Sequence, residues 1–136
     1  MNIEILETAI VNRLKTAITD VKVEAIPDDP QNYKLLHPKG AILVHYSGSK
    51  FKAPDLVDYI AQDRYVTFDV FLSIRGLRNN NGAYNYLETT KSLLTGFSTD
   101  DIGKMYPIDE SFQGQDNGLW HYYIRIQGKT KHEERL

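Results

Sequence analysis

The amino-acid sequence predicts an α+β fold, a two-layer sandwich in which two helices lie on one face of a mostly antiparallel sheet of four to five strands. Two segments repeat apolar residues at steps of three and four, and residues 65–75 alternate between apolar and polar side chains. The length of 136 residues fits one domain covering residues 1–136, and a hydrophobic content of 41% is enough for a normal core.

The two helices are predicted over residues 3–18 and 83–97. The apolar stripe of the first helix consists of Ile3, Leu6, Ile10, Leu14, Ala17 and Ile18. Asn2 can cap its first amides, and Thr19-Asp20 ends it. The stripe of the second helix consists of Ala83, Tyr86, Leu87, Thr90, Leu93, Leu94 and Phe97. Gly96 is expected to terminate this second helix.

The strands are predicted outside these helices, at residues 21–24, 41–46, 65–75, 105–112 and 120–127. Pro107 restricts the fourth of them to a sheet edge or to its own start. Residues 115–118 have the composition of a hairpin turn. Irregular structure is expected in a long connection over residues 47–63, in a polar loop at 78–82 and in a frayed, charged tail at 129–136.

The strand at residues 65–75 divides its side chains between two faces of the sheet. We expect both helical stripes to pack on the apolar face, which consists of Val66, Phe68, Val70, Leu72 and Ile74. The opposite face consists of Thr67, Asp69, Phe71, Ser73 and Arg75. The last strand alternates in the same way, with His121, Tyr123, Arg125 and Gln127 on its more polar side.

Composition excludes several classes of protein. The chain has no cysteine, which excludes disulfides, thiol nucleophiles and thiolate metal sites. With 16 basic and 18 acidic residues, its net charge of −2 argues against a protein whose main role is to coat nucleic acid. No signal peptide is expected at the N-terminus, and no stretch approaches the roughly 18 apolar residues of a membrane helix.

Motifs for catalysis or metal binding are absent from the sequence. No phosphate-loop, dinucleotide or nucleophile-elbow signature occurs. The acid pairs Asp28-Asp29 and Asp100-Asp101 could support acid–base chemistry only across a cleft, so solvated loops are the favoured interpretation. The histidines show no metal-ligand spacing; they are His37, His45, His121 and His132. A small enzyme is therefore the weakest hypothesis, and we expect no catalysis, no cofactor and no metal.

Aromatic and basic side chains gather on the more polar sheet face. Phe71 and Tyr123 are expected there, beside Arg75 and Arg125. Tyr and Arg are enriched at protein interfaces, so this face suits contact with a neighbouring subunit. Aromatic side chains on a sheet can also stack bases, so a nucleic-acid-binding module is the alternative. The acidic net charge favours the subunit contact.

The layout of the chain resembles that of a phage protein family. The residues that carry the resemblance are the segment His37-Pro38-Lys39-Gly40-Ala41-Ile42-Leu43-Val44-His45-Tyr46, the alternating strand Tyr65–Arg75, and the closing hairpin with Trp120. Over residues 2–128 the order is similar to that of the small tail-completion proteins of Mu-like phages. In fold order it also resembles the tail terminator called minor tail protein U of lambda-like phages. The resemblance brings no catalytic residue with it.

This resemblance implies a structural role in a phage or in a headless phage-tail-like particle. Such proteins form a ring, usually sixfold, that caps the tail tube and meets the head connector. The implied partners are further copies of the chain, the tail tube and sheath proteins, and the connector, without a membrane. DNA would pass through the pore without sequence-specific contact. The implied location is the virion tail, assembled in the host cytoplasm.

A set of residues is predicted to contact neighbouring subunits or the tail tube. These residues are Phe71, Arg75, Arg78, His121, Tyr123, Arg125, Lys50 and Lys52. The segments at residues 47–63 and 78–82 are expected to contribute further contacts and to be poorly ordered in an isolated monomer.

Overall fold

Five strands form a single sheet in the computed structural model, which describes residues 1–32, 38–54 and 58–135. The elements in chain order are α1 (Ile3–Ala17), β1 (Lys22–Ala25), η1 (Pro30–Asn32), β2 (Gly40–Phe51), β3 (Tyr59–Arg75), α2 (Ala83–Leu94), β4 (Tyr106–Asp116) and β5 (Leu119–Arg135). The strand order is β1-β2-β3-β5-β4. Only the β1–β2 pair is parallel, so the prediction of an α+β fold with a mostly antiparallel sheet is confirmed.

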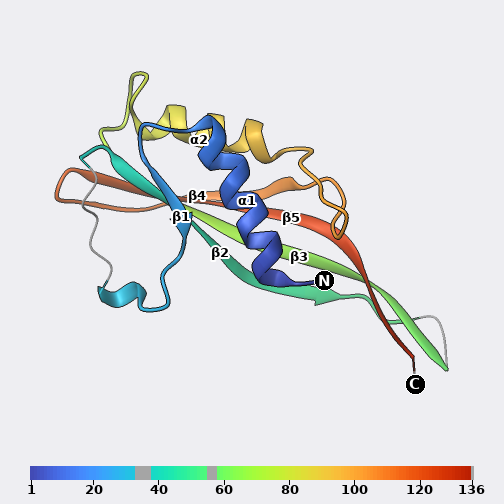
Figure 1. Ribbon diagram of the computed structural model, residues 1–136. Coiled ribbons are helices and arrows are strands. Elements are labelled where there is room, and N and C mark those ends of the chain that lie inside the picture. Colours follow the sequence, from blue (N-terminus) through green and yellow to red (C-terminus); the bar gives the residue numbers. More distant parts are fainter. Residues whose placement is uncertain (33–37, 55–57, 136) are drawn as a thin grey trace.

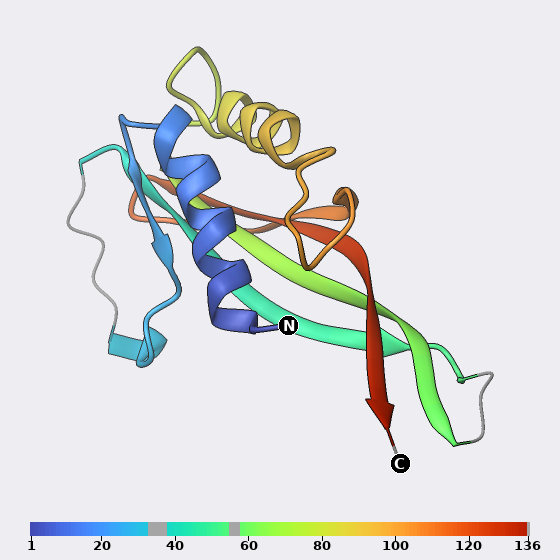
Figure 2. The same ribbon diagram turned by 45° about the vertical axis from the view of Figure 1, so that its right-hand side comes forward.

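Both helices cover the same face of this sheet, which we call the helix side (Figures 1 and 2). Helix α1 begins where the Asn2 side chain accepts a hydrogen bond from the Ile5 amide at 3.0 Å, as predicted. Helix α2 ends at a C-cap on Thr95, and Gly96 follows with a φ of +84°, a conformation that glycine adopts without strain. Neither helix in the described part of the chain is long and apolar enough to cross a membrane.

The core lies between the helices and the helix side of the sheet. The five apolar residues predicted for β3 are all fully buried: Val66, Phe68, Val70, Leu72 and Ile74. They pack with buried residues of both helical stripes, among them Leu6, Ile10, Leu14, Leu87 and Leu94. Burial of one such side chain stabilises the fold by about 1.5–3 kcal/mol. The helices therefore pack on this face of the sheet, and the opposite face stays uncovered.

Strands β2, β3 and β5 are longer than predicted, which corrects two expectations. Residues 47–51 and 59–63 are not irregular, because β2 continues to Phe51 and β3 begins at Tyr59. The tail from residue 129 is not frayed, because β5 pairs with β3 as far as the Arg135–Tyr59 pair. Both extensions lack the apolar alternation of a half-buried strand, since no helix covers them.

These extensions form a three-stranded projection, which we call the arm. It consists of residues 47–51 of β2, 59–66 of β3 and 128–135 of β5, and it runs on past both helices (Figures 1 and 2). Lys129 and Lys131 of β5 form ion pairs with Asp63 of β3 at 3.4 and 2.9 Å. The predicted irregular connection also includes residues 55–57, which lie outside the described residues, as does His37.

Strand β4 lies at one edge of the sheet, and Pro107 stands next to its first residue, as predicted. A two-residue turn, Asn117-Gly118, joins β4 to β5. Both turn residues have positive φ values, 52° and 77°, which is the geometry of a type I′ hairpin. The β4–β5 pair contains two register shifts, so the face on which each β4 side chain lies cannot be read from simple alternation.

Candidate functional site

The sheet face opposite the helices, which we call the open face, carries most of the predicted contact residues. The register aligns open-face residues into rows across four strands. The rows, each from β2 to β4, are Ala41–Ser73–His121–Gly114, Leu43–Phe71–Tyr123–Ser111 and His45–Asp69–Arg125–Asp109. Side chains directly opposite in such pairs lie about 4.5–5.5 Å apart at Cβ, so each row is a line of contacts.

An ion pair between Asp69 and Arg125 occupies the middle of the open face. Arg125 Nε lies 2.8 Å from Asp69 Oδ1, and Arg125 Nη2 lies 3.3 Å from Asp69 Oδ2. Asp69 is only 7% exposed, although it lies on the uncovered face. The hydrogen bond to the Asp69 carboxylate raises the pKa of Arg125 above its ordinary value. This geometry is bidentate, which is the strongest arrangement for an arginine and a carboxylate.

Tyr123 joins the same group of side chains. Its hydroxyl donates a hydrogen bond to Asp109 Oδ2 at 2.6 Å, and the Arg125 guanidinium carbon lies 5.2 Å from the centre of its ring. The hydrogen bond raises the pKa of the Tyr123 hydroxyl and lowers the pKa of the Asp109 carboxyl. Both ends of Tyr123 are therefore held in place.

His121 and Arg75 are also tied to neighbours. His121 Nδ1 lies 2.7 Å from the Ser73 hydroxyl, and its Nε2 lies against Asp116 at the end of β4. Arg75 Nη1 donates to the carbonyl oxygen of Asn117 in the hairpin turn at 3.2 Å. The polar groups along this end of the open face are thus paired within the subunit.

Phe71 forms the apolar centre of the open face, together with Leu43 beside it on β2. Both residues are half-buried. The Phe71 ring stacks on the ring of His45, with 6.4 Å between centroids. An aromatic centre surrounded by paired charges is the usual composition of a protein–protein interface.

The structure brings five of the eight predicted contact residues together, and Lys50 lines an open-face hollow that one of them, Arg125, also lines. Phe71, Arg75, His121, Tyr123 and Arg125 share the main open face. Lys50 lies on the arm in β2, and Lys52 follows directly after that strand. Arg78 belongs to a different surface, because its guanidinium carbon lies 5.9 Å from the ring of Tyr84 at the start of α2. The prediction that Arg78 contacts a neighbouring subunit or the tail tube stays a prediction.

Sequence reasoning missed the acidic partners on this face. Asp69 alternates with the core residues of β3, so its face was predictable, but its contact with Arg125 depends on the β3–β5 register. The positions of Asp109 and Asp116 depend on the register shifts in β4. Their only sequence signal is that β4 carries three acidic residues and no basic one.

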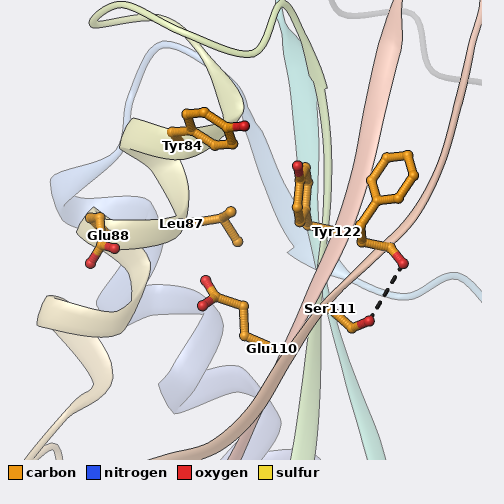
Figure 3. Close-up of a pocket in the computed structure, with 7 residues that line it drawn as sticks. Tyr84, Leu87, Glu88, Glu110, Ser111 and Tyr122 are labelled. Atoms are coloured by element: carbon orange, nitrogen blue, oxygen red, sulfur yellow. Dashed lines mark hydrogen bonds between the residues drawn. The ribbon is translucent and has the colours of Figure 1, made fainter.

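Two concave regions flank this central group. On the open face, a hollow of about 420 Å³ is lined by Ser47, Gly48, Ser49, Lys50, Thr67, Ile108, Arg125 and Gln127. On the helix side, a groove of about 510 Å³ lies between α2 and β4 and is lined by Tyr84, Leu87, Glu88, Glu110, Ser111, Phe112 and Tyr122 (Figure 3). We call the second region the α2–β4 groove.

A model of the Gp37 family, described as Gp37 protein, matches residues 10–134 of the chain. The chain belongs to the Gp37 family. This is a phage-related family, so the relationship to phage proteins expected from the layout is confirmed at that level. No curated protein matches the chain.

In this Gp37-family chain the described histidines lie on strands and the acid pairs lie in loops. Both acid pairs, Asp28-Asp29 and Asp100-Asp101, lie in exposed loops, as expected. Among the described residues, no group of three or more His, Cys, Asp or Glu side chains could hold a metal ion. The described histidines instead contact aromatic, hydroxyl or carboxylate neighbours on the sheet.

Proposed function

We propose that this Gp37-family chain is a structural subunit of a phage or phage-tail-like particle, which caps the tail tube as a ring of six copies and joins it to the head connector. The observation that carries the proposal is the open face, where charged groups pair with one another around Phe71 and Leu43. The membership of a phage-related family and the layout of the chain support the same role.

The pairing of charges on the open face favours a protein partner. Covering a charged side chain with protein removes it from water, and this is costly unless the charge is already paired. Arg125 and Asp69 are paired before any partner arrives, so a neighbouring subunit can cover them at a reduced cost. The half-buried Phe71 adds the aromatic contact area on which interface energies commonly depend.

The same pairing makes a nucleic-acid-binding module the weaker alternative. Binding to phosphate requires cations that can release counterions, and its strength falls steeply with salt. Arg125 is engaged by Asp69, and Arg75 by a backbone carbonyl group, so neither guanidinium has all its donors available for phosphate. A gel-shift experiment at low salt tests the alternative, and salt-dependent binding of DNA or RNA would favour it.

Genetic complementation in the host particle tests the proposed function. Particles lacking the chain should carry aberrantly long tails or tails without heads, seen by electron microscopy. The variant Phe71→Glu should fail to restore normal tails, because it places a charge at the centre of the open face. The matched control is Ile5→Glu, since Ile5 is 64% exposed on α1, on the helix side of the molecule.

Two results would contradict this proposal. Normal tails in particles that lack the chain would remove the role in tail completion. Normal tails with a folded Phe71→Glu variant would show that the open face is ordinary solvent-exposed surface. We expect Phe71→Glu to fold, because Phe71 lies outside the helix-covered core. Circular dichroism and thermal unfolding check the folding of both variants.

A further inference from the structure

The outer edge of β2 is one of the two strand edges of the arm. Strand β1 pairs with β2 only at residues 41–44, so the outer side of β2 is unpaired along the arm in the described residues. Phe51, at the end of β2, is 49% exposed on the helix side. Its ring lies 5.1 Å from the Arg64 guanidinium carbon and 5.5 Å from the centre of the His132 ring. Lys50 and Lys52 flank it, and the segment 47–52 contains no acidic residue.

A second exposed edge has the opposite charge. Strand β4 is the last strand of the sheet, and within the described residues no strand pairs with its outer side. It carries Asp109, Glu110 and Asp116 and no basic residue. Phe112 is 52% exposed beside the α2–β4 groove, and its ring lies 5.4 Å from that of Tyr122. In Figure 3, Glu110 extends from β4 toward Leu87 of α2.

The two edges place the same kinds of side chain on the same faces of the sheet: each has an aromatic residue on the helix side and a charged residue on the open face. On β4, Glu110 and Phe112 stand on the helix side, because they are opposite Ile124 and Tyr122, whereas Asp109 is opposite Arg125 on the open face. On β2, Phe51 stands on the helix side and Lys50, its neighbour, on the open face. If β2 of a second copy lies beside β4 with its helix side on the same side of the sheet, Phe51 is next to the α2–β4 groove and Lys50 is next to Asp109.

We propose that the arm of one copy docks along β4 of a second copy, with Phe51 in the α2–β4 groove and Lys50 and Lys52 facing the carboxylates of β4. The inference rests on the proposed function and deepens it, because it names a further contact between neighbouring subunits of the ring, in addition to the open face. The two surfaces differ, so the contact is heterologous and repeats from copy to copy until a ring closes. Opposite charges on the edges favour this pairing over contact between two arms or two β4 strands.

Within one subunit the two surfaces cannot meet. Phe51 is aligned through Arg64 with Thr130 of β5, and Phe112 is aligned with Tyr122 of the same strand. These two positions on β5 are separated by about 26 Å, at roughly 3.3 Å per residue of strand. A disulfide needs Cα atoms closer than about 7 Å, so a disulfide between position 52 beside Phe51 and position 113 beside Phe112 must join two copies.

Disulfide trapping tests the contact, and the natural absence of cysteine removes any background. Lys52→Cys places a thiol on the arm next to Phe51, and Gln113→Cys places one on β4 next to Phe112. The two variants are mixed at high protein concentration and oxidised. The expected result is a disulfide-linked pair that forms about tenfold or more faster than the pair of Lys52→Cys with Ile5→Cys, because docking raises the effective thiol concentration.

Further variants separate specific docking from chance collision. Adding Phe51→Ser to Lys52→Cys should reduce trapping to the control rate, and adding Lys50→Glu should slow it. The double variant Lys52→Cys/Gln113→Cys should give a ladder of oligomers, since each copy then carries both halves of the contact. A trapping rate equal to the Ile5→Cys control, or one that Phe51→Ser does not change, overturns the inference.

The trapping experiment and the complementation experiment test the arm contact and the proposed function separately. Efficient trapping together with normal tails in particles lacking the chain would retain the arm contact and reject the tail role. Defective tails in particles lacking the chain, with trapping at the control rate, would retain the tail role and reject this contact between subunits.

Discussion

Replacing Arg125 with methionine (R125M) should destabilise the subunit more than the loss of any exposed ion pair. The substitution keeps an unbranched apolar side chain and removes the guanidinium group. Asp69 then remains on the sheet with a carboxylate that is only 7% exposed and has lost both of its bonds to Arg125. The cost arises mainly from this uncompensated charge and less from the attraction that is lost.

The expected magnitude follows from the burial of each partner. Removing one member of a fully buried pair costs about 3–5 kcal/mol. The Arg125 side chain is 38% exposed, so water can reach part of the carboxylate after the substitution. We therefore expect R125M to lower the free energy of unfolding by about 2–3 kcal/mol. Asp69→Asn combined with R125M should recover much of this loss, because the stranded charge is then gone.

Urea unfolding of the four members of this double-mutant cycle measures the effect. The control is Lys22→Met, which breaks the exposed ion pair with Glu24. It should cost less than about 1 kcal/mol. A cost of R125M equal to that of the control, or a double variant no more stable than R125M alone, would refute the claim that Asp69 depends on Arg125.

Three further predictions concern the core, a tight contact and a titration. Phe68→Ala should cost about 3–5 kcal/mol of unfolding free energy, since Phe68 is fully buried, and a loss below about 1 kcal/mol would mean that the core is wrongly placed. Gly128→Ala should cost about 1–3 kcal/mol in thermal unfolding, because its Cβ would lie 2.6 Å from Ile102 Cδ1; an unchanged melting temperature would contradict this. Tyr123→Phe should raise the pKa of Asp109 toward its ordinary value in an NMR titration, because the hydrogen bond from Tyr123 lowers that pKa. In the unaltered chain the Tyr123–Asp109 hydrogen bond stabilises the fold at pH values above the ordinary carboxyl pKa, and this stabilisation is lost as the pH falls through the lowered pKa of Asp109. An unchanged pKa of Asp109 in the variant would show that Tyr123 does not cause the shift.

The fold was predictable where one face of an element is buried. Strand β3 from Val66 to Ile74 alternates because the helices cover one of its faces, and the alternation identified that face correctly. The arm was not predictable in this way, because no apolar alternation continues through residues 59–65 or 129–135. Its order comes from strand pairing and from ion pairs such as Lys129–Asp63, which depend on residues distant in the sequence.

The candidate site was predictable as a face but not as a set of contacts. Alternation places Phe71, Tyr123 and Arg125 on the same side of the sheet without knowledge of the register. The partner of Arg125 requires the alignment of Asp69 with Arg125, and that alignment is fixed by the whole length of β3 and β5. Arg78 follows β3 closely in sequence, but the chain turns away toward α2 there, so Arg78 lies apart from the open-face residues.

Strand β5 is synthesised after every other element of the sheet, yet it lies between β3 and β4. Until it emerges, β4 has no strand to pair with, the arm has only two strands, and Tyr122 is missing from the α2–β4 groove. Pairing over such sequence distances forms late and slowly. A chain that ends before β5 would therefore lack the paired β4 strand and the complete α2–β4 groove.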